Sequence, residues 1–152
     1  VEPGRLDCEI HVGFPALFPD DYLPDVHMRL LMYKRIASAE DSNALKELEI
    51  ESIDRFGLLP DAAKHLFRLS RLKLRARPLG ISKIDADEDG GIVHFIQNPP
   101  LDISELIVLI QEAPRTYRLA SANQLEFEAG LETAEQRFSF IEQLLARFSH
   151  PN

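Results

Sequence analysis

The sequence is short of cysteine, tryptophan and glycine. It holds one cysteine, Cys8, no tryptophan and only 7 glycines among 152 residues. One cysteine cannot close an intrachain disulfide or build a cysteine-based metal site, which excludes disulfide-rich secreted folds. The chain has no run of 18 apolar residues, no initiator Met and no signal peptide at its Val-Glu-Pro-Gly-Arg start. We therefore expect an excised piece of a soluble, cytoplasmic protein with no membrane partner.

Positive charge is also scarce. The chain carries 17 Lys and Arg against 25 Asp and Glu, a formal net charge of −8 at pH 7. A dedicated nucleic-acid binder depends on many Lys and Arg contacts with phosphates, so this balance favours protein or small-molecule partners. The contents of 45% hydrophobic and 28% charged residues are typical of a globular protein. A length of 152 residues fits one domain.

Motifs for cofactors and catalysis are missing. The glycines build neither a phosphate-binding loop nor a dinucleotide fingerprint, and no serine lies in G-x-S-x-G. The histidines never stand at the i, i+4 spacing of a helical zinc site. Cys8 falls in an alternating pattern that favours a packed thiol, and the acidic run from Asp85 to Asp89 favours a solvated turn. We expect no catalytic, cofactor-binding or metal site.

The chain begins with a predicted strand and a predicted helix. Residues 6–14 alternate around Leu6 and Cys8 with the two-residue period of a half-buried strand, and a loop follows. The first helix begins after Pro24 and ends near Ser38. The residues predicted to face inward along it are Val26, Leu30, Tyr33 and Ala37.

Two more helices are predicted to follow. Asp41 caps the second helix, which ends at Gly57 with positive φ and with Leu58 packed back against it. The third helix begins at Pro60 and reaches about residue 79, where Gly80 stops it. The predicted inward residues of the second helix are Leu45, Leu48, Ile53 and Phe56. Those of the third helix are Ala63, Leu66, Phe67, Ser70 and Leu74.

The second half of the chain predicts two hairpins and two helices. One hairpin turns at Asp89-Gly90-Gly91, a helix spans residues 103–112, and a second hairpin joins residues 117–119 to 125–127. Thr133 caps a last helix with an apolar face of Phe138, Ile141, Leu144, Leu145 and Phe148. The order βαααββαββα predicts an α+β fold with helices on a mainly antiparallel sheet. We expect one domain over 1–152, with a strand and loop in 1–18, three helices in 20–79, and the hairpins with two helices in 80–152.

The third helix carries a stripe of cations on one face. Its members recur at i, i+4, i+7 and i+11, and they are Lys64, Arg68, Arg71 and Arg75. Such a stripe fits either a solvated face or a contact with nucleic acid or an acidic partner. The absence of aromatic residues on that face and the net acidity favour the solvated face.

The second helix has an acidic outward face with an apolar residue in it. Its helical wheel places Glu47, Ile50, Glu51 and Asp54 outward and Arg55 at the rim. Glu51 and Arg55 form a well-oriented i, i+4 pair, which would also support an isolated helix. Periodicity alone therefore leaves two alternatives, a solvated helix face and a protein-docking face.

Three long segments carry a family resemblance. They are Pro19-Asp-Asp-Tyr-Leu-Pro-Asp-Val, then Arg29-Leu-Leu-Met-Tyr-Lys-Arg-Ile-Ala-Ser, then Glu51-Ser-Ile-Asp-Arg-Phe-Gly-Leu-Leu-Pro. The chain resembles the C-terminal domain of the bacterial transcription-repair coupling factors, the Mfd family. The likeness continues to the last helix and covers nearly the whole chain.

The resemblance implies a non-catalytic regulatory module of transcription-coupled nucleotide excision repair. The parent of the family is an ATP-dependent DNA translocase that displaces stalled RNA polymerase and recruits UvrA, and its ATP and Mg²⁺ belong to the motor. The C-terminal domain is implied to dock on the UvrB-like N-terminal module and to hide its UvrA-binding surface. The family's E-[LM]-x-D-R-[FY]-G segment supplies docking residues. Its acids and its arginine match Glu51, Asp54 and Arg55.

Two positions depart from the family pattern. Ser52 replaces the usual Leu or Met on the inward face of the second helix, and His27 replaces a frequent Asn.

The leading hypothesis for the function is an autoinhibitory docking domain, as the resemblance implies. The alternative is a nucleic-acid-contacting accessory domain that uses the cationic stripe, and a small enzyme comes third.

Overall fold

The computed structural model describes residues 7–149, so Leu6 lies outside the described residues. It divides into two compact units, and each is described by itself. The helical unit is Phe14–Leu74, and the sheet unit joins residues 7–13 to Arg75 and the residues that follow it. The predicted α+β class and the order βαααββαββα are confirmed, with one 3-10 turn added. The assignment of the whole chain to one domain stays a prediction.

The helical unit contains α1 (Val26–Ser38), α2 (Ser42–Phe56) and all but the last two residues of α3 (Asp61–Ala76). Carboxylates begin the first two helices: Asp25 accepts a hydrogen bond from Met28 N at 3.2 Å, and Asp41 accepts one from Ala44 N at 2.8 Å. These bonds satisfy amide groups that the first turn leaves unpaired. The predicted capping role of Asp41 is therefore confirmed.

Gly57 ends α2 as predicted, but the chain leaves the helix differently. Its φ of 99° confirms the positive value, whereas its ψ of −176° lies far from the left-handed helical region. A Schellman turn needs that region to fold the chain back. Leu58 is consequently 86% exposed, so the prediction that it packs against α2 is wrong.

The core of the helical unit corrects the predicted face of α1. Met32 and Ile36 are buried, whereas Val26 and Leu30 are 57% and 61% exposed. Apolar residues lie on both sides of α1, so periodicity alone did not identify the side that packing selects. Ile53 of α2, also predicted to face inward, is 39% exposed. The buried cluster consists of Phe18, Leu23, Met32, Ile36, Ala39, Leu45, Leu48, Ala63 and Phe67.

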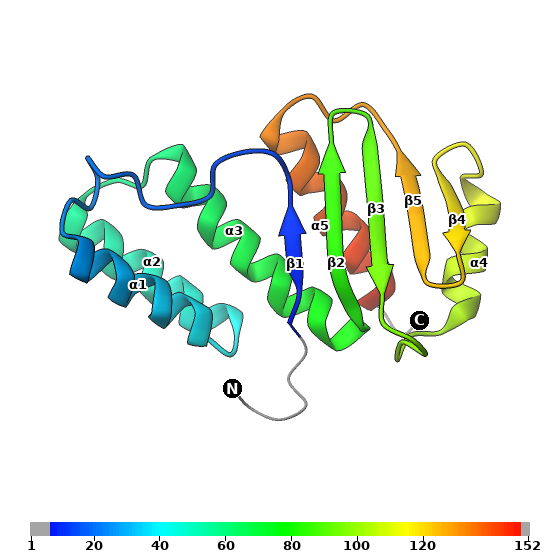
Figure 1. Cartoon of the computed structure of the whole chain (residues 1–152), viewed down its shortest axis with the longest axis horizontal. Coiled ribbons are helices and arrows are strands. Elements are labelled where there is room, and N and C mark those ends of the chain that lie inside the picture. Colours follow the sequence, from blue (N-terminus) through cyan, green and yellow to red (C-terminus); the bar gives the residue numbers. More distant parts are fainter. Residues whose placement is uncertain (1–6, 150–152) are drawn as a thin grey trace. The chain divides into compact units, whose positions relative to one another are not determined.

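The sheet unit is built on five strands in the order β1-β2-β3-β5-β4, visible in Figure 1. The strands are β1 (Glu9–His11), β2 (Ile81–Asp87), β3 (Gly90–Phe95), β4 (Tyr117–Ser121) and β5 (Gln124–Glu128). β1 pairs with β2 in parallel, and every other pairing is antiparallel. Both predicted hairpins are present, and Cys8 is buried as expected.

A 3-10 turn, η1 (Arg77–Leu79), separates α3 from β2, so α3 itself ends about three residues earlier than predicted. Gly80 follows with a φ of 76°. A Cβ atom at Gly80 would lie 2.7 Å from Pro100 Cδ and 3.0 Å from Pro99 Cβ. The left-handed backbone and this close approach together require glycine at the predicted stop.

Two helices complete the sheet unit, α4 (Ile103–Glu112) and α5 (Ala134–Ser149). α5 packs on the sheet through ring pairs such as Phe127 with Phe140, whose centroids are 5.0 Å apart. Thr133 begins α5 with a capping box: Gln136 N donates to Thr133 Oγ1 at 3.1 Å, and Thr133 N donates to Gln136 Oε1 at 3.0 Å. All five residues predicted for its inward face are buried.

Among residues 7–149, no helix is both long enough and apolar enough to cross a membrane.

Candidate docking surface

The outward face of α2 has the composition that its helical wheel predicts. Leu45, Leu48 and Ser52 are buried on one side, so residues on the opposite side face solvent. Ser52 is fully buried, and its hydroxyl donates to the carbonyl of Leu48 at 2.8 Å. On the outward side, Ile50 is 50% exposed between two exposed acids. Those acids are Glu47 and Asp54.

Two arginines hold Glu51, and one of them, Arg35, joins this face to α1, while Arg55 belongs to α2 itself. Glu51 Oε2 accepts from Arg35 Nη1 at 2.7 Å and from Arg55 Nη1 at 2.9 Å, and Glu51 Oε1 accepts from Arg35 Nη2 at 2.8 Å. These hydrogen bonds, first from Arg35 and then from Arg55, lower the pKa of Glu51 to about 2. Glu51 therefore stays ionised over the whole physiological pH range.

Further contacts hold both guanidinium groups. Arg55 Nη2 lies 3.4 Å from Met28 Sδ, and its guanidinium carbon lies 5.0 Å from the centroid of the Phe56 ring. Arg35 Nη1 lies 3.6 Å from Met32 Sδ. Each arginine side chain is nevertheless 41% exposed. The surface thus presents charges that are held by the fold and still reachable by a partner. We call Arg35, Glu51 and Arg55 the ion-pair cluster.

Sequence reasoning found Glu51 and Arg55 but missed Arg35. Glu51 and Arg55 are four residues apart on one helix, a spacing that the sequence shows directly. Arg35 belongs to α1, 16 residues before Glu51, and the two meet only because α1 packs beside α2. The one signal available was the position of Arg35 inside the second segment that carries the family resemblance.

The cationic stripe of α3 is largely engaged inside the fold. Arg71 forms an ion pair with Glu49, and Arg75 Nη2 donates to the carbonyl of Glu142 at 3.2 Å. Arg68 is partly buried, and Lys64 is exposed. Arg71 is therefore neutralised by a neighbouring acid, which reduces the positive field that a phosphate would meet.

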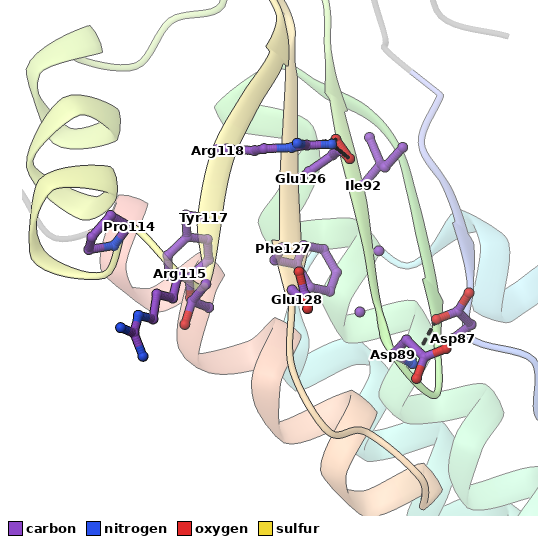
Figure 2. Close-up of a pocket in the computed structure, with 13 residues that line it drawn as sticks. Asp87, Asp89, Ile92, Pro114, Arg115, Tyr117, Arg118, Glu126, Phe127 and Glu128 are labelled. Carbon is purple, nitrogen blue, oxygen red and sulfur yellow. Dashed lines mark hydrogen bonds and ion pairs between the residues drawn. The ribbon is translucent and has the colours of Figure 1, made fainter.

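A hollow of about 600 Å³ lies on the sheet unit, lined by the end of β2, by residues of β3, β4 and β5, and by turns beside these strands. In Figure 2 the Arg118 side chain extends to Glu126, and it binds that carboxylate at 2.8 to 3.0 Å. The Asp87 carboxylate accepts from Asp89 N at 2.8 Å. Burial raises the pKa of Tyr117 at the rim. The lining contains no histidine, serine or cysteine, so it brings no nucleophile and imidazole base together.

The acidic run of the first hairpin is only partly the expected solvated turn, because Asp85 and Asp87 lie in β2 and only Glu88 and Asp89 form the turn. Asp87, Glu88 and Asp89 are exposed, and Asp85 pairs with Lys83 at 3.4 Å. Among the described residues 7–149, no group of three or more His, Cys, Asp or Glu side chains is arranged to hold a metal ion.

The sequence profile of the TRCF domain matches residues 12–106, which contain α1, α2, α3 and the ion-pair cluster. The chain belongs to the TRCF domain family. The chain is 42% identical over 137 residues to the transcription-repair-coupling factor of Escherichia coli (strain K12). It is 44% identical over 144 residues to that of Haemophilus influenzae (strain ATCC 51907 / DSM 11121 / KW20 / Rd). The resemblance noted in the sequence is thereby confirmed.

The alignments cover 90% and 95% of this chain but only 12% and 13% of those two relatives. The chain thus corresponds to a small part of a much longer protein. The fold agrees with the crystal structure of a C-terminal domain of transcription-repair coupling factor, with a TM-score of 0.79 and 18% identity over 97% of both chains. The family membership implies a place in transcription-coupled DNA repair.

Proposed function

We propose that this chain is the non-catalytic, autoinhibitory C-terminal domain of a bacterial transcription-repair coupling factor. It docks on the UvrB-like N-terminal module of the same protein and masks the UvrA-binding surface of that module. Docking ends when the parent ATP-dependent DNA translocase engages stalled RNA polymerase on duplex DNA. Such a clamp works only if docking is favourable in the closed state and is lost in the engaged state.

The observation that carries this proposal is the outward face of α2. Glu51, Asp54 and Arg55 match the family's docking segment, and all three reach solvent on one helix. Ile50 lies among them and is 50% exposed. Protein interfaces combine a few desolvated anchors with complementary charges at their rim, and this face offers both.

A charged pair that docking desolvates makes a large contribution to specificity. Removal of one member leaves the opposing charge buried without a partner, which costs about 2–5 kcal/mol. In water the same side chains contribute little, because exposed ion pairs are worth about 0–1 kcal/mol. Substitution of these residues should therefore weaken docking far more than it weakens the fold.

The test compares UvrA binding by the full-length coupling factor with and without the triple substitution Glu51→Ala, Asp54→Ala and Arg55→Ala. We expect the variant to bind UvrA more tightly in the absence of RNA polymerase, because its clamp opens. Arg118→Ala is the matched control, because it breaks a bidentate Arg–Glu pair in the sheet unit. Equal UvrA affinity in wild type and the triple variant, with both proteins folded, would refute the docking assignment.

The alternative is nucleic-acid contact through Lys64, Arg68, Arg71 and Arg75. It predicts duplex binding that weakens steeply with salt, because each neutralised phosphate releases counterions. The ion pair between Arg71 and Glu49 argues against it. Titration of this chain with duplex DNA at two salt concentrations separates the two functions.

A further inference from the structure

The Glu51 carboxylate accepts more hydrogen bonds within its own chain than a solvated surface carboxylate does. A carboxylate offers roughly four lone-pair positions, and its three hydrogen bonds from Arg35 and Arg55 fill three of them. One position remains for a donor on a partner. The direction of that remaining position is fixed by the two arginines, and above all by Arg35, which binds both carboxylate oxygens.

The geometry of the Arg35 contact is well suited to orienting a side chain. Two parallel N–H···O hydrogen bonds of 2.7 and 2.8 Å hold the Glu51 carboxylate side by side with the Arg35 guanidinium group. Arg55 then binds the oxygen Oε2 that Arg35 Nη1 also binds. Loss of Arg35 would therefore release Glu51 into several rotamers and leave Arg55 with a moving partner.

The charges of the neighbourhood agree with an orienting role. Two guanidinium groups around one carboxylate give the ion-pair cluster a net charge of +1. In residues 7–149, no hydrogen bond or ion pair engages the exposed carboxylate of Asp54, which stands three positions after Glu51. A partner thus meets a fixed pair of cations beside a free acid. A basic group facing Asp54 and an acidic group near Arg35 and Arg55 would match this pattern.

We propose that Arg35 is a positioning residue of the docking surface, which holds Glu51 and Arg55 in the orientation that the UvrB-like module binds. This inference rests on the proposed function and extends the docking machinery from α2 to α1. Its physical basis is preorganisation: ordering a flexible side chain on binding costs conformational entropy, and the Arg35 contact orders Glu51 before docking, so docking does not incur that cost.

The experiment measures UvrA affinity of the full-length coupling factor without RNA polymerase, for wild type and for Arg35→Ala. We expect Arg35→Ala to open the clamp and raise UvrA affinity about threefold to tenfold, in line with the loss of one or two preordered side chains. Arg35→Lys keeps the charge but loses the bidentate geometry, so it should give an intermediate rise. Arg118→Ala, which breaks a bidentate pair elsewhere, should leave UvrA affinity at the wild-type value.

A double-mutant cycle distinguishes positioning from a purely structural or direct role. If Arg35 acts through Glu51, then Arg35→Ala adds nothing in a Glu51→Ala background. A further rise in that background would overturn the inference, because Arg35 would then act by itself on the partner or on the fold. Unchanged or lower UvrA affinity of Arg35→Ala would overturn it as well.

The outcomes also separate this inference from the proposed function. If the triple variant of Glu51, Asp54 and Arg55 raises UvrA affinity and Arg35→Ala does not, only the role of Arg35 fails. If neither variant changes it, the docking function itself fails. Thermal melting of each protein shows that the compared variants are folded.

Discussion

Helices α1 and α5 each pack one face against a core, and they differ in which residues, polar or apolar, their opposite face exposes to water. Every apolar residue predicted to face inward on α5 is buried, and its outer positions such as Glu135 and Gln143 are polar. On α1 the core takes Met32 and Ile36, while Leu30 and Val26 remain in water. α5 thus buries its predicted apolar face entirely within the sheet unit. α1 carries apolar side chains that its unit does not bury, together with the arginine that orders the candidate docking surface.

The largest expected effect tests which face of α1 matters for folding. Met32→Ala should lower the free energy of unfolding by about 2–5 kcal/mol, because it leaves a cavity in the helical core. Leu30→Ala should change it by less than about 0.5 kcal/mol, since the side chain is already exposed. Urea unfolding of this chain, followed by circular dichroism, measures both. Equal losses would show that the packed face of α1 has been misassigned.

The next effect concerns a buried cation in the sheet unit. Arg137 is 8% exposed and donates to the carbonyls of Val12 and Leu131, both at 2.7 Å. Arg137→Ala should cost about 3 kcal/mol in the free energy of unfolding, because two buried carbonyls lose charge-assisted hydrogen bonds. The exposed Arg118→Ala should cost less than about 1 kcal/mol, as expected for a surface pair. A smaller loss for Arg137 than for Arg118 would contradict the contrast between buried and exposed cations.

The smallest effect is a pH dependence carried by the ion-pair cluster. The pKa of Glu51 falls from an ordinary 4.5 to about 2 in the folded chain. Its contribution to stability is therefore complete above pH 4.5 and is lost as the pH falls through about 2. Because Glu51 is partly exposed, wild type should exceed Glu51→Gln by less than about 1 kcal/mol at neutral pH. Unfolding experiments at several pH values should show this difference shrinking on acidification, and a difference that grows would contradict it.

These contrasts show how far the sequence can lead. α5 has apolar residues on a single face, so a period of 3.6 identifies its buried side without knowledge of any partner. α1 has them on two faces, and only packing against Phe18 and Leu45 determines which one is buried. The exit of the chain at Gly57 likewise depended on ψ, which the residue type leaves open.

The candidate site divides along the same line. Glu51, Asp54 and Arg55 lie on one helix at spacings that place them together on its surface. Helical geometry and the family resemblance therefore both select them from the sequence. Arg35 completes the cluster from another helix, and that meeting is a property of the tertiary structure. Contacts within an element could therefore be predicted, and the contact between elements could not.

The central claim is that the outward face of α2 touches the UvrB-like module in the resting protein, and site-specific photo-crosslinking tests it most directly. Ile50 and Leu119 are 50% and 49% exposed, so a photoreactive phenylalanine analogue at either position samples its surroundings from similar exposure. In the full-length coupling factor without RNA polymerase, we predict that position 50 crosslinks to the UvrB-like module and that the triple substitution of Glu51, Asp54 and Arg55 abolishes the product. A crosslink from position 119 that is as strong as that from position 50, or none from position 50, would contradict the claim.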